Sequence, residues 1–267
     1  MSHRLPAVVL ALAVLAATGS LGLALYKLHR AAALEHPLNP TVAEVVQSPP
    51  TPEPTVAPSA TPSPTPVPTP IPDSLIIKVP YTVQAPLGWS YDPGYEEWCE
   101  ATAIYMVGLY YKGDTRDRVP GAEADRSIRP VVAYERQAFP GVKDLPFTDM
   151  TQVGAQEYNL DAVIEPATPD SIRQELANGH PVIVPVMTHG LPGGRAIAPF
   201  YGAGNVYHVI LIKGYDVGKG LYYTNDAGFT EGETYPYTWD VLSTAIDAQT
   251  PKMGQGRVML VFRPRAA

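Results

Sequence analysis

The chain has 267 residues, of which 45% are hydrophobic and 17% charged, and its formal net charge is −7. This length suffices for one domain of ordinary size with a hydrophobic core, plus additional segments. From residue 73 onward the chain carries 16 basic and 23 acidic residues without a basic run. We therefore expect no nucleic acid as a partner, because an acidic surface repels phosphates.

Residues 1–30 are predicted to be a signal anchor or a signal peptide. Residues 5–26 are apolar or small and carry no charge, and as a helix they would extend about 33 Å, enough to cross a bilayer. The small residues 16–20 offer a site for cleavage. The apolar run continues beyond them, which favours an uncleaved anchor. We therefore expect membrane association through residues 5–26.

Residues 31–72 are predicted to form a stalk. Between Ser48 and Pro72 lie 11 prolines, five threonines and one charged residue. Such a segment cannot bury apolar surface, and its many prolines favour an extended polyproline II conformation. A stalk after a membrane segment indicates a single-pass protein with residues 73–267 outside the cytoplasm, or a secreted protein if the signal is cleaved.

Residues 73–267 show the pattern of one folded α+β domain. Strands are predicted at 75–79, 181–187, 206–215, 221–224 and 257–262. Helices are predicted at 96–111, 149–158, 169–178 and 239–248. The third helix has the clearest boundaries, with Thr168 as N-cap, Pro169 at the first position and Gly179 just past the end.

Cys99 is the only cysteine of the chain. Outside the cytoplasm cysteines usually occur in disulfides, so a single one is either a buried apolar side chain or a reactive thiol. It lies where a turn-rich stretch gives way to a predicted helix. In the first turn of a helix, free N–H groups and the helix dipole favour the thiolate. The sequence therefore indicates a nucleophile with a lowered pKa.

His208 is the best candidate for the base that a reactive cysteine requires. It opens the apolar run from Tyr207 to Tyr215, which is typical of a central strand, although a hydrogen-bonded core histidine would give the same pattern. His180 and His189 fall in predicted connections, and His189 also fits a cleft edge.

A third residue that would orient the histidine is predicted after a hairpin. Strands 206–215 and 221–224 are joined by a short turn, so the chain after Thr224 returns toward His208. Asn225 or Asp226 could then accept a hydrogen bond from the imidazole. Asp226 is slightly preferred, and an ordinary Asn-Asp-x-Gly turn remains the alternative.

These residues together resemble a known family. The segments Val79–Pro86, Trp98–Ala103, Tyr207–Val209 and Asn225–Asp226 are similar to papain-like cysteine peptidases. The resemblance is strongest to the bacterial family related to the bacteriocin-processing, double-glycine leader peptidases (cysteine peptidase family thirty-nine), in an extracytoplasmic branch. It runs from about Ile77 to Phe262 and implies a papain-like fold, with the cysteine helix packed on an antiparallel sheet.

The resemblance also implies roles. Cys99 would be the nucleophile, His208 its base, Asp226 the orienting residue, and Gln84 a donor to the oxyanion hole beside the Cys99 amide. Trp89, Trp98 and Tyr207 are expected to bind substrate. The aromatic residues just before Cys99 would fit packing beneath the helix equally well.

The expected function is hydrolysis of peptide bonds through a thioester, with a peptide or protein as substrate and no cofactor. No metal is expected, because no His-Glu-x-x-His motif is present. Unlike the transporter-fused processing peptidases, this chain has no Walker-type phosphate-binding loop, and its stalk indicates the outer face, so the resemblance does not imply double-glycine cleavage. An acyl transferase or transpeptidase and a non-catalytic binding module remain the alternatives, and we expect a monomer.

Overall fold

The computed structural model describes residues 71–265. This part contains a sheet of seven strands in which every pair is antiparallel. Its order is β2-β7-β3-β4-β5-β6, with β1 paired to the end of β4. The strands are β1 (Ser74–Ile76), β2 (Leu160–Pro166), β3 (Val182–Met187), β4 (Tyr207–Asp216), β5 (Leu221–Asn225), β6 (Glu233–Thr238) and β7 (Val258–Pro264).

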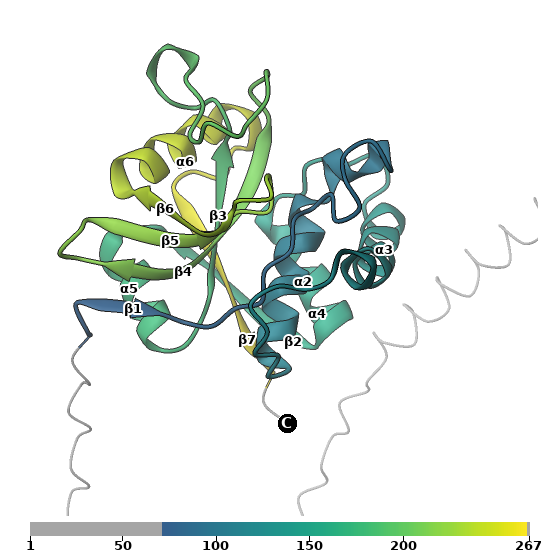
Figure 1. Ribbon diagram of the computed structural model, residues 1–267, viewed down its shortest axis with the longest axis horizontal. Helices are drawn as coiled ribbons and strands as arrows, with labels where there is room; N and C mark the ends of the chain where they lie inside the picture. Colours follow the sequence, from purple (N-terminus) through teal and green to yellow (C-terminus); the bar gives the residue numbers. More distant parts are fainter. Residues whose placement is uncertain (1–70, 266–267) are drawn as a thin grey trace, which may run out of the picture. The chain divides into compact units, whose positions relative to one another are not determined.

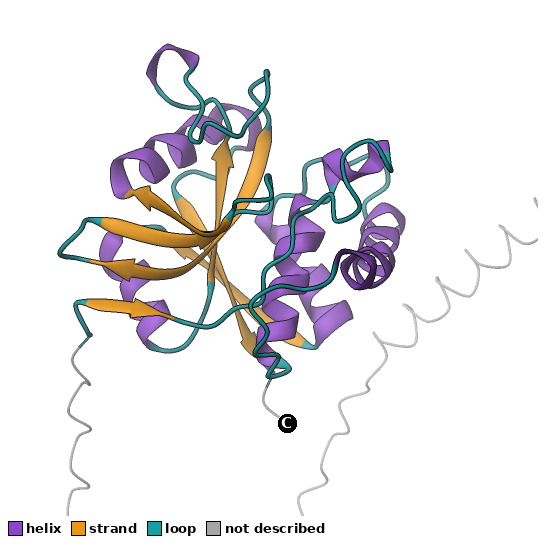
Figure 2. Cartoon of the chain, in the orientation of Figure 1, coloured by secondary structure: helices purple, strands orange, loops and turns teal. Residues whose placement is uncertain are grey.

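Helices cover the sheet and fill the connections (Figure 2). The α-helices are α2 (Cys99–Tyr111), α3 (Gly121–Ala138), α4 (Phe147–Tyr158), α5 (Pro169–Ala177) and α6 (Trp239–Met253). Two short 3-10 helices, η1 (Pro93–Glu97) and η2 (Pro192–Gly194), precede α2 and β4. In Figure 1, α2, α3 and α4 gather on one side of the sheet, whereas α5 and α6 lie on the other.

Two hydrophobic cores result, one on each face of the sheet. The first joins helices α2, α3 and α4 to side chains such as Val209, Leu211 and Phe262. The second joins α5 and α6 to the opposite side chains, such as Ile210 and Ile212. Strand β4 is therefore buried on both faces, as its continuous apolar sequence predicts. Residues at its start are held rigidly between the two layers.

Several predicted elements are confirmed with small shifts at their ends. Helix α5 begins with the predicted cap, in which the side chains and backbones of Thr168 and Ser171 bond reciprocally. The hairpin of β4 and β5 is present, with Leu211 opposite Asn225 and Asp216 opposite Leu221. The predicted α+β class with a helix packed on an antiparallel sheet is confirmed.

Two strands and one α-helix were not predicted from the sequence. Strands β2 and β6 carry polar and half-exposed residues, because they lie at the two edges of the sheet. Helix α3 contains Pro130, and proline usually indicates a helix end. Its buried residues nevertheless recur at helical spacing, as Ala124, Ile128, Val131 and Glu135 show.

The predicted anchor and almost all of the predicted stalk lie outside the described residues. Among residues 71–265, none of the helices combines the length and apolar character needed to cross a bilayer.

Candidate active site

Cys99 is the first residue of α2. The sequence predicts one helix from Glu96, but η1 ends at Glu97 and Trp98 has non-helical backbone angles between the two helices. The break arises because Asp92 caps η1 separately, accepting a hydrogen bond from the Gly94 N–H just after Pro93. As a result, the amide of Cys99 lies in the first turn of α2, where backbone N–H groups lack intrahelical acceptors.

The thiol of Cys99 contacts a carboxyl group and a strand amide. Its side chain is buried, with 4% of the residue exposed. The sulfur donates to Oε2 of Glu100 at 2.9 Å and accepts from the backbone N–H of Val209, beside His208. Within the described residues, no hydrogen bond joins the Cys99 sulfur to the His208 ring.

This environment corrects one prediction. Burial, followed by the charge of Glu100 and the hydrogen bond to it, raises the pKa of Cys99 well above its ordinary value. The lowered pKa that the helix end predicts is therefore wrong for this arrangement of the side chains. The helix dipole is a modest effect, and a buried carboxyl group in direct contact with the sulfur outweighs it.

His208 and Asp226 form a buried pair. His208 is the second residue of β4, and Asp226 directly follows β5 on the neighbouring strand. Nε2 of His208 lies 2.9 Å from Oδ1 of Asp226, and the two residues are 3% and 0% exposed. Because Nε2 faces the carboxylate, Nδ1 is the ring nitrogen left for proton transfer.

Asp226 is surrounded by hydrogen-bond donors. The Tyr201 hydroxyl lies 2.8 Å from both carboxylate oxygens, the Tyr237 hydroxyl donates to Oδ2 at 2.7 Å, and the Gly228 N–H donates to Oδ1 at 3.0 Å. Burial raises the pKa of Asp226, but the charge of His208 and these hydrogen bonds outweigh it, so the pKa lies below its ordinary value. Asp226 is therefore an anion that fixes the imidazole.

The choice between Asn225 and Asp226 is decided by side-chain direction. Successive residues of an extended chain point to opposite faces. Asn225 points away from His208, and its amide donates to the carbonyl oxygens of Val79 and Pro80 at 3.0 and 3.3 Å. It thus connects the segment before η1 to the sheet, whereas Asp226 contacts the histidine.

Gln84 lies in the segment between β1 and η1, and its side chain is buried. Its amide nitrogen donates to the Tyr95 carbonyl at 2.9 Å and approaches the Glu96 carbonyl at 3.5 Å. Its backbone N–H donates to the Ala227 carbonyl, next to Asp226. The residue therefore joins the chain before Cys99 to the loop after β5, and one of its two amide hydrogens makes only a long contact.

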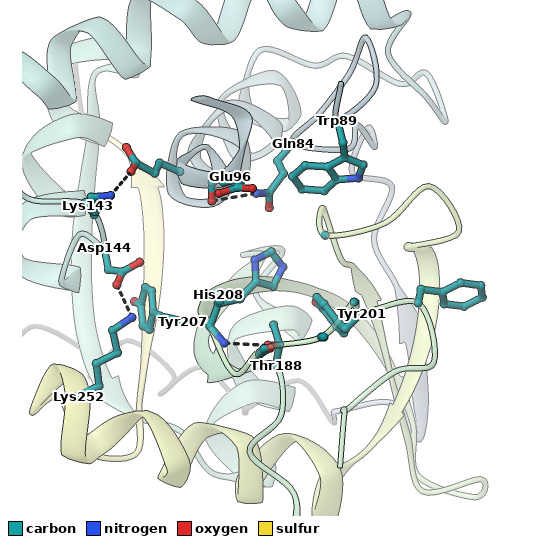
Figure 3. A pocket seen from close by; sticks show the side chains of 17 residues that line it. Gln84, Trp89, Glu96, Lys143, Asp144, Thr188, Tyr201, Tyr207, His208 and Lys252 are labelled. Atoms are coloured by element: carbon teal, nitrogen blue, oxygen red, sulfur yellow. Dashed lines mark hydrogen bonds and ion pairs between the residues drawn. The ribbon is translucent and has the colours of Figure 1, made fainter. Parts of the chain in front are cut away.

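A cleft of about 720 Å³ is lined by Gln84 and His208, whereas the buried Cys99 and Asp226 lie behind its lining residues. Figure 3 shows the His208 ring pointing into it, with Gln84 on the opposite wall. The wall from the helical side includes Trp89, Glu96 and Asp144, and the wall from the sheet side includes Phe200 and Gly204. His208 lines this cleft, although only 3% of the residue is exposed to solvent.

The two ends of the cleft differ in chemistry. At one end two ion pairs gather, in which Lys143 contacts Glu97 at 3.1 Å and Lys252 of α6 contacts Asp144 at 2.5 Å. The second pair crosses from the helical wall to the sheet wall. Trp89 lies toward the opposite end (Figure 3), half exposed.

The predicted substrate-binding aromatics separate into two groups. Trp89 and Tyr207 line the cleft. Trp98 does not, because it is 2% exposed and packs edge-on against Tyr95 at 4.6 Å between ring centroids, with the Arg129 guanidinium 5.2 Å from its ring. The prediction that Trp98 binds substrate is therefore corrected to a packing role at the break between η1 and α2.

Three polar contacts of the site were not predicted. Glu100 contacts the thiol, and Tyr201 and Tyr237 contact Asp226. Glu100 follows Cys99 directly in an otherwise apolar buried stretch, and this was the available signal. The tyrosines come from a loop and an edge strand that only the tertiary fold brings to Asp226. Residues 71–265 contain no cluster of three or more side chains suited to a metal ion.

Comparison with known proteins assigns the chain to a family. The model of the peptidase C39-like family matches residues 76–248. The chain belongs to the peptidase C39-like family. This is the family that the sequence motifs resemble, and the protein is a cysteine peptidase.

Two solved structures are similar to the chain. One is described as a C39-like peptidase from Bacillus anthracis, with 15% identity and a TM-score of 0.46 over 73% of this chain and 99% of that chain. The other is xylellain, a cysteine protease from Xylella fastidiosa, with 13% identity and a TM-score of 0.43 over 73% of this chain and 87% of that chain. Comparison with curated proteins gave no match.

Proposed function

We propose that this C39-like peptidase cleaves peptide bonds with Cys99 as the nucleophile and His208 as general base and acid. The observation that carries the proposal is the buried His208–Asp226 pair at 2.9 Å, whose ring faces the cleft beside the first turn of α2. A carboxylate that holds one imidazole nitrogen leaves the other free to exchange a proton with a nucleophile.

The reaction would proceed in two steps. His208 takes the thiol proton at Nδ1, and the sulfur attacks the carbonyl carbon of the scissile bond. The imidazolium then protonates the leaving amine, which breaks the carbon–nitrogen bond and leaves a thioester. Water, activated by His208, hydrolyses the thioester and restores the thiol. The attack requires the S–H bond of Cys99, which points to Glu100, to turn toward the histidine.

The developing oxyanion would be stabilised by two N–H donors. One is the backbone amide of Cys99 in the first turn of α2, and the other is the Gln84 side-chain hydrogen that makes only a 3.5 Å contact with the Glu96 carbonyl. Gln84 is held by its second amide hydrogen, which donates to Tyr95 at 2.9 Å. This fixed position would cost little reorganisation when the carbonyl oxygen becomes charged.

The substrate would be an extended peptide or an exposed loop of a protein. The cleft accommodates a segment of several residues, with Trp89 available at one end and the ion pairs of Lys143 and Lys252 at the other. An apolar side chain fits the first end and a polar or charged group the second.

A peptide library tests this proposal. The full-length chain in detergent is incubated with the library, and new N-termini are identified by mass spectrometry. Cleavage by the wild type and its loss in both Cys99→Ala and His208→Ala, with unchanged melting temperatures, are expected. Amine-adducted products in place of free carboxylates would indicate an acyl transferase. No turnover, with peptide binding retained, would indicate the binding module.

We further propose that residues 5–26 anchor the protein in the membrane and that the stalk carries the peptidase on the extracytoplasmic side. The uncharged apolar run and the proline-rich segment support this proposal. Protease added to intact cells should release the peptidase domain while the anchor stays in the membrane fraction. Recovery of the whole chain in the soluble cytosol would contradict it.

A further inference from the structure

A carboxyl group that the mechanism above does not use lies against the nucleophile. Oε2 of Glu100 is 2.9 Å from the Cys99 sulfur, and Oε1 accepts from the backbone N–H of Leu145 at 3.0 Å. Glu100 is 1% exposed, and no lysine, arginine or histidine pairs with it among the described residues. Both oxygens are therefore fixed, one by the backbone and one by the reacting thiol.

The surroundings of Glu100 favour its neutral form. Cys99 faces it from α2, Glu135 from α3, Asp144 from the loop before α4 and Tyr207 from β4. These groups are neutral or negative. Burial raises the pKa of Glu100 to about 7, against the lowering by the bonds from Cys99 and Leu145. A small change of pH near neutrality thus changes the charge beside the sulfur.

We propose that Glu100 is a further catalytic residue: its ionised carboxylate keeps the Cys99 proton, and its protonated form releases the sulfur to His208 and then donates a hydrogen bond to the thiolate. The inference rests on the proposed role of Cys99. It assigns Glu100 control over the form in which the nucleophile exists.

The form with Glu100 protonated holds one proton more than the form with Glu100 ionised, and solvent supplies this proton. With Glu100 ionised, the sulfur keeps its hydrogen and donates it to Oε2. A thiolate at this distance from a carboxylate would meet direct charge repulsion in a buried site. With Glu100 protonated, the S–H bond breaks, its proton moves to Nδ1 of His208, the electron pair stays on sulfur, and the Oε2–H group donates to the thiolate. The neutral carboxyl group thus stabilises the thiolate–imidazolium pair.

Alkylation of Cys99 as a function of pH tests the proposal. The rate constant for iodoacetamide is measured on the full-length chain from pH 5 to 10. In the wild type we expect a thiolate fraction that decreases as Glu100 ionises near pH 7 and rises again when the thiol itself ionises. Glu100→Gln, whose amide is neutral and donates at every pH, should remove the decrease and raise the rate at pH 8 by about tenfold or more.

Glu135→Gln is the matched control, because Glu135 is a buried carboxyl group near Glu100 that makes no contact with the sulfur. It should change the rate at pH 8 less than threefold. A single monotonic rise in the wild type, or equal profiles for the wild type and Glu100→Gln, overturns the proposal. The wild-type profile decides the matter even if Glu100→Gln does not fold.

The readout is thiol chemistry and needs no peptide turnover. If Cys99→Ala retains peptidase activity, the proposed nucleophile fails whatever the alkylation profile shows. If Cys99 is essential but its alkylation does not respond to Glu100→Gln, the role of Glu100 alone fails. The two failures are therefore distinguishable.

Discussion

Removing one hydroxyl group from Tyr237 should destabilise the domain by a measurable and local amount. The Tyr237 hydroxyl donates to the fully buried carboxylate of Asp226 at 2.7 Å. Tyr237→Phe keeps the ring and deletes this donor, so Oδ2 retains only the bond from Tyr201. A hydrogen bond to a buried charged group contributes about 1.5–3 kcal/mol.

The expected shift in melting temperature follows from the size of the described domain. Residues 71–265 number 195, and at about 2.1 cal/mol/K per residue their unfolding entropy is about 0.4 kcal/mol/K. A loss of about 1.5–3 kcal/mol therefore corresponds to a melting temperature about 4–7 °C lower. Differential scanning calorimetry at pH 7 measures this shift, and the rate of peptide cleavage should fall as well, because Asp226 holds His208 less firmly.

Tyr235→Phe is the control for this prediction. Tyr235 lies in the same strand, its ring packs 4.9 Å from that of Tyr237, and its hydroxyl makes no hydrogen bond within the described residues. Its removal should change stability by less than about 0.5 kcal/mol.

The pH dependence gives a second check of the same substitution. The pKa of Asp226 is lower in the folded than in the unfolded protein. The ionised Asp226 therefore stabilises the folded domain above the unfolded pKa, and this stabilisation is lost as pH falls through the folded pKa. The difference in free energy of unfolding between the wild type and Tyr237→Phe should thus shrink below about pH 4, near the unfolded pKa of aspartate. Equal losses in both tyrosine variants, or a difference that grows in acid, would refute the reasoning.

Two further substitutions test the geometry around the site. Gly232→Ala would place a Cβ atom 1.8 Å from the Asp226 carbonyl oxygen, so the backbone of Asp226 must shift. We expect the free energy of unfolding, measured by chemical denaturation, to fall by about 1–3 kcal/mol, and most of the peptidase activity to be lost. Lys252→Gln removes the ion pair with Asp144 across the cleft. Because both partners are partly exposed, the free energy of unfolding should change by less than about 1 kcal/mol, whereas KM for peptides bound at that end should change more than kcat. A large loss of melting temperature in Lys252→Gln, or full activity in Gly232→Ala, would contradict these expectations.

The sequence by itself determined the class of chemistry. The patterns that indicated it are local: a single cysteine at the start of a helix, a histidine at the start of a buried strand, and an Asn-Asp pair after the next strand. The structure contains all three, because chain order and the alternation of side chains along a strand determine them. The hairpin of β4 and β5 makes Asp226 a neighbour of His208 through residues close in sequence. The start of helix α5 could also be predicted, because its cap is contained in four consecutive residues.

Only the tertiary structure decided the charge environment of the nucleophile. Whether Cys99 is a thiol or a thiolate depends on burial, on the neighbouring Glu100, and on groups from β4 and the loop before α4, which are far apart in the sequence. The same holds for Trp98, whose packing beneath the helix break excludes it from the cleft, and for Tyr237, which reaches Asp226 from an edge strand. Electrostatic energies depend on distance and solvent access in space, and the order of residues along a chain does not contain either quantity.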